Sequence, residues 1–80
     1  MTKESTIQVK VKLFASLRIR RFKNAQLEFP QGTSIGDGLN HLGISERILG
    51  LALVNGQRVP LDQPLRDGDT LAVFPLVAGG

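Results

Sequence analysis

The chain has 80 residues, of which 41% are hydrophobic and 21% charged, and this size and balance fit one small globular domain with a single core. It contains no cysteine, which excludes disulfides, thiolate metal sites and a cysteine nucleophile, and its single histidine excludes a metal site built from several histidines. We expect a cytoplasmic protein, because no apolar run is long enough to span a bilayer and the N-terminus lacks a signal-peptide pattern.

The formal net charge of +3 combines two segments of opposite sign. Up to Lys23, seven basic residues stand against one acidic residue, for a net +6; from Asn24 onward, three stand against six, for a net −3. Such segregation can steer an acidic partner, and it is equally consistent with the simple solvation of two faces.

The first part of the chain shows the period-two alternation of β-strands. Residues 7–14 alternate apolar with polar side chains, which predicts a half-buried strand. Its inward residues are expected to be Ile7, Val9, Val11 and Leu13. Residues 15–24 have no clean period and carry the basic cluster, so they are predicted to form a loop with room for one helical turn. Residues 25–29 alternate again before Pro30, and the two strands are expected to form an antiparallel hairpin.

A helix is predicted to begin after Ser34. Ser34 and Asp37 have the spacing of a capping box, and Gly43 is well placed as the C-terminal cap. The apolar residues that share one face of this helix are Ile35, Leu39 and Leu42. Two internal glycines weaken the helix by about 1 kcal/mol each relative to alanine, so packing must hold it.

Three short strands are predicted in the rest of the chain. Residues 51–54 are apolar, Asn55-Gly56 is a strong two-residue turn signal, and residues 57–60 return as an edge strand. Residues 70–74 form the last strand, and Pro75 is expected to end its pairing. One helix on one face of a mixed five-stranded sheet is an α+β roll, in which the first and last strands can lie side by side at the centre.

No catalytic constellation is evident in the sequence. His41 is expected on the polar face of the helix, and the glycine-rich residues 32–38 lack the Lys-Ser/Thr ending of a phosphate-binding loop. Asp67 and Asp69 flank Gly68 in a turn pattern that is only a thin signal for calcium. We therefore predict no metal site.

The most informative stretch is the end of the chain, Gly79-Gly80. Glycine has no Cβ and can enter a channel too narrow for other residues. The terminal α-carboxylate has a pKa of about 3.5 and resists nucleophilic attack until its oxygen becomes a good leaving group. Such an end is suited to activation by another enzyme. We expect residues 1–75 to form the domain and residues 76–80 a flexible tail.

Several segments before this end occur in a characteristic order: LVNG at residues 53–56, VPLD at 59–62, LRDGD at 65–69 and FPLVAGG at 74–80. Together with VKLFASLR at residues 11–18 they resemble the MoaD/ThiS family of ubiquitin-like sulfur carriers. The tail is most similar to that of the molybdopterin synthase small subunit. The resemblance implies a ubiquitin-like β-grasp fold.

The resemblance also implies a function for Gly80. An E1-like adenylating enzyme would activate the Gly80 carboxylate with ATP, and sulfur would then replace AMP to give a C-terminal thiocarboxylate. The sulfur would be delivered in molybdopterin biosynthesis, for a molybdenum or tungsten cofactor, inside the molybdopterin synthase large subunit or another acceptor enzyme. The chain would be a co-substrate or a small subunit, not an enzyme, and would bind no cofactor itself.

Other functions share some of these features. The chain could carry sulfur for thiamine or another pathway, or it could be a ubiquitin-like modifier joined through Gly80 to target lysines. The products separate carrier from modifier: a terminal thiocarboxylate against an isopeptide conjugate. The weakest alternative is a nucleic-acid binding module that uses the basic residues 18–23 and Phe22, a stretch for which a solvated turn is the favoured interpretation.

The partner surface is expected on the exposed face of the sheet. Leu71 and Val73 are predicted to point inward, so Phe74 points outward. Alternation alone does not orient the residues before the Asn55-Gly56 turn, but the resemblance puts Leu53 outward as well. Leu53 and Phe74 are predicted to form an exposed apolar patch at the root of the tail. The remaining contact residues would be Pro75, Leu76 and Val77, followed by Ala78, Gly79 and the reactive Gly80.

Overall fold

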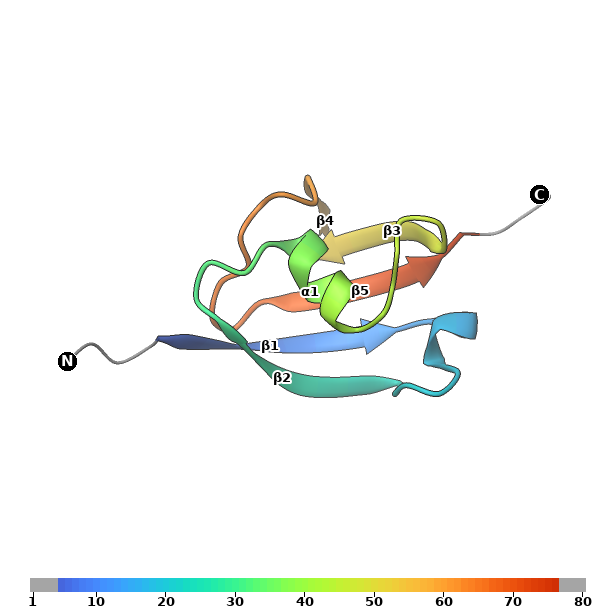
Figure 1. The fold of residues 1–80 in the computed structure, drawn as a ribbon, viewed down its shortest axis with the longest axis horizontal. Coiled ribbons are helices and arrows are strands. Elements are labelled where there is room, and N and C mark those ends of the chain that lie inside the picture. Colours follow the sequence, from blue (N-terminus) through green and yellow to red (C-terminus); the bar gives the residue numbers. More distant parts are fainter. Residues whose placement is uncertain (1–4, 77–80) are drawn as a thin grey trace.

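The structure, a computed structural model, describes residues 5–76 and contains one mixed sheet with a helix on one face (Figure 1). Its elements, in chain order, are β1 (Thr6–Leu13), the 3₁₀ helix η1 (Ala15–Arg18), β2 (Asn24–Pro30), α1 (Ile35–His41), β3 (Leu49–Val54), β4 (Gln57–Arg58) and β5 (Thr70–Pro75). The strand order across the sheet is β2-β1-β5-β3-β4. The two central strands, β1 and β5, are parallel, and the other pairs are antiparallel.

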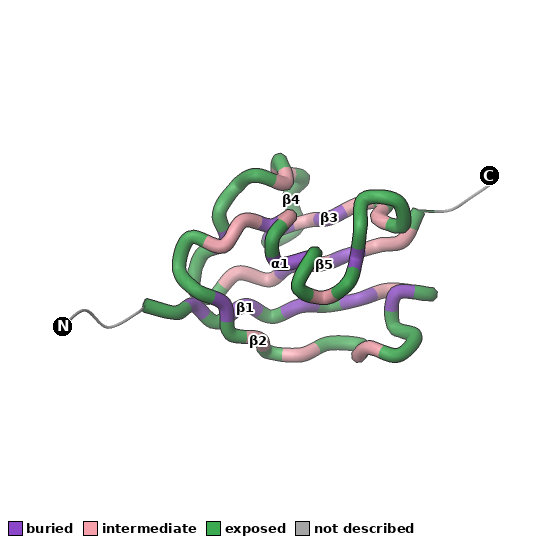
Figure 2. Tube along the Cα trace, in the orientation of Figure 1, coloured by how far each residue is buried: buried purple, intermediate pink, exposed green. Residues whose placement is uncertain are grey.

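β1 confirms the predicted alternation over its whole length. Its residues are alternately exposed and buried, and the four predicted inward side chains are all buried. Val11 and Leu13 lie opposite Leu71 and Val73 of β5, so the two central strands present one continuous apolar surface to the helix (Figure 2). The predicted hairpin with β2 is also confirmed, in a register that places Ile7 opposite Phe29.

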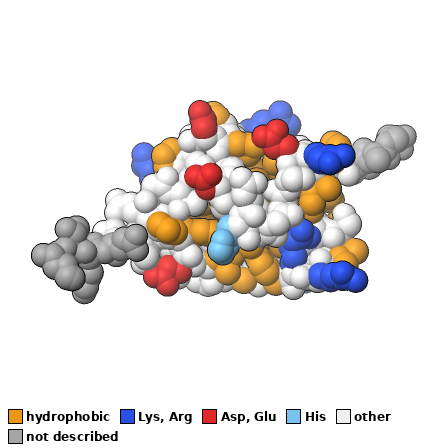
Figure 3. Space-filling model, viewed as in Figure 1, with side chains coloured by type: hydrophobic (Ala, Val, Ile, Leu, Met, Phe, Trp, Pro, Cys, Tyr) orange, Lys and Arg blue, Asp and Glu red, His pale blue; other side chains and the backbone are white. Residues whose placement is uncertain are grey.

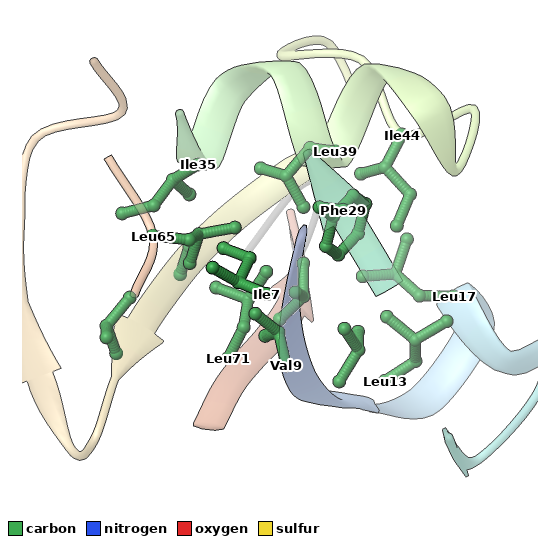
Figure 4. Close-up of a cluster of buried hydrophobic side chains, with 14 residues drawn as sticks. Ile7, Val9, Leu13, Leu17, Phe29, Ile35, Leu39, Ile44, Leu65 and Leu71 are labelled. Atoms are coloured by element: carbon green, nitrogen blue, oxygen red, sulfur yellow. The ribbon is translucent and has the colours of Figure 1, made fainter. Parts of the chain in front are cut away.

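The core lies between this sheet face and α1 (Figure 4). Ile35 and Leu39 of the helix are buried against side chains from β1, β2 and β5, whereas Leu42 is only half-buried. Three further core side chains come from connecting segments that the sequence pattern treats as loops: Leu17, Ile44 and Leu65. All fourteen buried side chains in this cluster are hydrophobic.

The predicted ends of α1 are confirmed. The Ser34 hydroxyl accepts a hydrogen bond from the Asp37 backbone N–H (3.1 Å), which satisfies one free donor of the first turn. Gly43 follows the helix with a φ of +77°, the left-handed conformation that glycine adopts without steric cost. With the helix only seven residues long, no helix within residues 5–76 has the length and apolarity that a membrane crossing requires.

In the second half of the sheet, the start of β3 and the end of β5 differ from the prediction. The Asn55-Gly56 turn is present, with φ values of +52° and +83°. However, β3 begins at Leu49, two residues earlier than predicted, and Pro75 lies in register opposite Leu49. The expectation that Pro75 ends the pairing is therefore wrong. Proline lacks an N–H but keeps its carbonyl, and the ladder continues to a hydrogen bond from Leu76 N–H to the Ile48 carbonyl (2.8 Å).

Candidate partner-docking site at the root of the tail

The described part of the candidate site is the end of β5 and the side chains around it. Gly80, with Val77, Ala78 and Gly79, lies outside the described residues. The chain leaves the sheet at Leu76, whose side chain is 58% exposed. The part of the site that the structure describes is therefore the surface around the end of β5, from which the tail starts.

Phe74 belongs to an aromatic stack on the outer face of the sheet. Its ring lies parallel to that of Phe14, with centroids 4.3 Å apart and an interplanar angle of 9°. The Arg18 guanidinium lies 5.6 Å from the centre of the Phe14 ring, and Arg18 Nε donates a hydrogen bond to the Leu13 carbonyl (2.8 Å). Phe74 is consequently half-buried, not fully exposed, and its ring is held in place before any partner binds.

The register of β3 places two leucines beside this stack. Leu51 lies opposite Phe74, and Leu53 lies opposite Ala72 on one side and Arg58 on the other. Ala52 and Val54 are buried, so Leu51 and Leu53 belong to the outer face, as predicted for Leu53. Leu53 and Phe74 are thus diagonal neighbours on one face. Both are half-buried, so the predicted patch exists in a less exposed form.

Three members of this patch were not assigned to it from the sequence: Phe14, Leu51 and the small Ala72. Phe14 follows the inward Leu13 and could have been assigned outward by the same alternation. Leu51 could be placed beside Phe74 only with the register of β3 and β5 in hand. From here on, the apolar outer patch means Phe14, Leu51, Leu53, Ala72 and Phe74.

Large exposed hydrophobic side chains gather at the same end of the molecule. Among residues 5–76 they are Ile19, Ile48 and Leu76. Ile19 follows η1 beyond the end of β1, Leu76 follows the end of β5, and Ile48 precedes the start of β3. Because β1 and β5 are parallel and β3 is antiparallel to β5, all three positions lie at the end of the sheet from which the chain leaves. Exposed apolar groups concentrated in this way mark an interaction surface.

Basic side chains frame the apolar outer patch. Lys12 lies opposite Ala72 on β1, and Arg58 lies opposite Leu53 on β4, so exposed cations stand on both sides of the apolar row. On the opposite, helix-bearing side, Lys and Arg side chains also gather at the end from which the tail leaves (Figure 3). The surroundings of the tail root are thus apolar at the centre and largely cationic at the edge.

Part of the basic cluster has a structural role. Arg21 donates hydrogen bonds to the carbonyls of Leu42 (3.0 Å), Gly43 (3.1 Å) and Leu17 (3.2 Å), so it caps the C-terminal end of α1 and ties η1 to it. Phe22 is half-buried and packs against the core. The aromatic side chain that a nucleic-acid interface would stack on a base is therefore engaged elsewhere.

The acidic turn is likewise structural. Asp69 accepts hydrogen bonds from Asn55 Nδ2 (2.9 Å) and from the Arg66 backbone N–H (2.8 Å), while Asp67 accepts one from the Gln8 backbone N–H (2.7 Å). Across residues 5–76, no three His, Cys, Asp or Glu side chains come together in a group that could hold a metal ion. His41 is exposed on α1, as predicted, with its ring edge-on to Phe29 at 6.0 Å.

Comparison with known proteins identifies a family. The model of the ThiS family matches residues 11–80, which is most of the chain. No curated protein sequence matches it.

Several solved structures are similar to this chain. A Pyrococcus furiosus protein described as molybdopterin converting factor, subunit 1, is 30% identical with a TM-score of 0.73, over 89% of this chain and 99% of that one. Small archaeal modifier protein 1 of Haloferax volcanii is 27% identical, with the same TM-score and coverage. Subunit 1 of the Helicobacter pylori molybdopterin-converting factor, solved in complex with subunit 2, is 21% identical with a TM-score of 0.62, over 92% and 100% of the two chains, and shows the shared fold.

The predicted ubiquitin-like β-grasp fold is confirmed, because the whole domain is structurally similar to Urm1 from Trypanosoma brucei, with a TM-score of 0.66, and to the ubiquitin of Caldiarchaeum subterraneum, with a TM-score of 0.64. The match of the family model over residues 11–80 identifies the lineage within that fold. The chain belongs to the ThiS family of small ubiquitin-like proteins.

Proposed function

We propose that this chain is a sulfur carrier whose reactive group is the Gly80 carboxylate. The observation that carries the proposal is the combination of a ThiS-family β-grasp domain with a chain end in Gly79-Gly80. Among the described residues, the apolar outer patch supports a docking role at the root of that tail, and we assign none of them a catalytic role. The chain therefore acts as a co-substrate, and an adenylating partner supplies the chemistry.

The reaction consists of two substitutions, the first at the α-phosphorus of ATP and the second at the Gly80 carbonyl carbon. The Gly80 carboxylate oxygen attacks the α-phosphorus of ATP and releases pyrophosphate, which leaves an acyl-adenylate. A sulfur nucleophile, written as hydrosulfide, then attacks the Gly80 carbonyl carbon and expels AMP, leaving the thiocarboxylate and one proton. No cysteine of this chain competes for the sulfur, because the sequence contains none.

We infer molybdopterin biosynthesis as the pathway. Two observations support it: the tail sequence FPLVAGG, and the 30% identity with the Pyrococcus furiosus protein described as molybdopterin converting factor, subunit 1. The acceptor would then be the large subunit of a molybdopterin synthase. The Helicobacter pylori complex, in which a domain of this fold is bound to subunit 2 of the molybdopterin-converting factor, supports a partner of that kind.

A second candidate function is supported by a different relative. The Haloferax volcanii protein is called a small archaeal modifier protein and is 27% identical. A modifier uses the same adenylated Gly80, but a lysine amine of a target replaces AMP and an isopeptide bond results. Carrier and modifier thus share the activation step and differ in the second nucleophile.

Deletion of Gly80 tests the proposal. The shortened chain should keep its stability to within about 0.5 kcal/mol, because glycine has no side chain that could be buried. It should fail to accept sulfur from an E1-like adenylating enzyme supplied with ATP and sulfide. Intact-mass spectrometry would detect sulfur-for-oxygen exchange in the full chain and its absence in the variant. Exchange in the variant would refute the role of Gly80, and isopeptide conjugates without exchange would favour the modifier.

A further inference from the structure

A β-bulge lies beside the point where the tail leaves the sheet. Leu49 is in register with Pro75 and Leu51 with Phe74, so two steps along β3 correspond to one step along β5. Gly50 is the extra residue of this bulge. Bulges of this kind bend the strand and redirect the neighbouring chain.

The position has no room for a side chain. A Cβ on Gly50 would overlap the carbonyl oxygen of Pro75, and it would lie 2.8 Å from the carbonyl carbon of Pro75 and 3.0 Å from Cα of Leu76. These are backbone atoms, which cannot rotate away as the end of a flexible side chain can. Any larger residue at position 50 must therefore displace the Pro75–Leu76 segment or β3 itself.

A second contact holds the same segment from the other side of the bulge. The Leu76 N–H donates a hydrogen bond to the Ile48 carbonyl (2.8 Å). Leu76 is thereby tied to the residue that precedes β3, although its side chain is 58% exposed. The last described residue of the chain is fixed by backbone contacts to residues 48–50 and not by the burial of its own side chain.

We propose that Gly50 is a positioning residue that sets the direction in which the reactive tail leaves the domain. This inference rests on the proposed function. A partner that grips the apolar outer patch holds the domain, so the path of the tail is fixed by how Pro75 and Leu76 lie on β3. A displacement of about 1 Å at a reacting group can cost about a hundredfold in rate. Gly50→Ala should therefore impair activation of Gly80 without weakening docking.

The first test uses the isolated protein. In Gly50→Ala, amide hydrogen exchange measured by NMR should show loss of protection at Leu76, while the amides of β1 keep theirs. Gly36→Ala is the matched control, because its Cβ would meet the Leu61 carbonyl oxygen at 3.4 Å, on the helix and away from the tail. Unchanged protection at Leu76 in Gly50→Ala would overturn the inference.

The second test measures activation with an adenylating enzyme that accepts the wild-type chain. ATP–pyrophosphate exchange at saturating carrier should fall at least about tenfold for Gly50→Ala, with the KM for the carrier within about twofold of wild type. A roughly tenfold rise in the KM for the carrier with an unchanged exchange rate at saturation would contradict a positioning role. No change in either quantity would contradict it as well. Failure of the wild-type chain to support exchange would instead refute the proposed function, and this inference with it.

A pair of variants at position 76 keeps the test independent of the folding of Gly50→Ala. Leu76→Pro removes the N–H that bonds to Ile48, and Leu76→Ala removes most of the side chain but keeps that N–H. If the backbone tie directs the tail, Leu76→Pro should lower the exchange rate at saturation well below that of Leu76→Ala. Equal rates for the two variants would overturn the inference.

Discussion

At the scale of single residues, Phe74 connects packing to recognition. Its ring is stacked on that of Phe14, and the Arg18 guanidinium lies 5.6 Å from the centre of the Phe14 ring. The Phe74 side chain is therefore ordered before a partner binds. An aromatic side chain that is already fixed loses little conformational entropy on binding. This arrangement suits Phe74 to the centre of an interface, with Leu51 and Leu53 beside it.

Phe74→Ala should weaken binding to the adenylating enzyme by tenfold or more, since central aromatic anchors cost about 2 kcal/mol or more when truncated. Loss of the ring pair should also lower the free energy of unfolding by about 0.5–1.5 kcal/mol, with the fold retained. Calorimetric titration of a purified enzyme measures the first effect, and His41→Ala on the helix side is the control. Unchanged affinity in a folded variant would move docking to the basic loop around Arg20.

Arg21 shows how a residue in a charge cluster can be structural. Arg21→Ala should lower the free energy of unfolding by about 1–3 kcal/mol, because three carbonyls at the end of α1 and in η1 lose a charged donor. Arg20→Ala removes an exposed neighbour of the same charge and should change stability by less than about 0.5 kcal/mol. Urea denaturation of both variants measures the difference, and equal values would contradict the capping role.

At the scale of elements, α1 is a short helix held by packing. It has seven residues and contains two glycines, a composition that favours no isolated helix. Three features stabilise the helix in place of intrinsic helix propensity: the Ser34 cap, the Arg21 hydrogen bonds, and the burial of Ile35 and Leu39.

Two glycines of this region should respond in opposite directions to alanine. A Cβ at Gly38 would lie 3.5 Å from Leu65 Cδ1 and 3.7 Å from Phe29 Cζ, which are ordinary contacts, so Gly38→Ala should stabilise the protein by up to about 1 kcal/mol. Gly43 has a φ of +77°, so Gly43→Ala should destabilise it by about 1–2 kcal/mol. Thermal unfolding followed by circular dichroism gives both signs, and a loss of stability in Gly38→Ala would contradict this account of the helix packing.

The elements were predictable where one local signal decides them. Alternation is sufficient for β1, a capping box for the start of α1, and Asn55-Gly56 for the β3–β4 turn. The start of β3 at Leu49 and the pairing of Pro75 with it were not predictable from the sequence. Both depend on a bulge at Gly50, which exists only when β3 pairs with β5. For a related reason, the sequence did not predict that three residues outside the strands and α1 belong to the core: Leu17, Ile44 and Leu65. Isolated apolar residues in irregular segments show no hydrophobic period.

At the scale of the whole molecule, charge surrounds the proposed docking face. One row across the sheet reads Asn24, Lys12, Ala72, Leu53 and Arg58 from β2 to β4, with cations on either side of the apolar pair. The sequence supplied the members of this row and the basic bias of the first segment, but neighbours from five strands become a surface only through the register.

Replacing both flanking cations should slow association with the partner. We expect Lys12→Ala with Arg58→Ala to lower the association rate about threefold to tenfold at low salt and to flatten its dependence on ionic strength, because steering by these charges is screened by salt. Stopped-flow measurements over a salt series test this, with Lys23→Ala plus Arg66→Ala as a control of equal charge change. An identical loss in the control would assign the effect to net charge and contradict a role of the docking face.

The parallel pairing of β1 and β5 has a mechanical consequence. A partner that draws the tail into a narrow channel exerts force along β5, which is hydrogen-bonded to β1 on one edge and to β3 on the other. The bonds on both edges lie across that force and bear it together, in shear. In a hairpin at the end of a chain that is pulled from its open end, by contrast, the hydrogen bonds would break one at a time. The domain is therefore built to resist traction on its last residues without the strand peeling away.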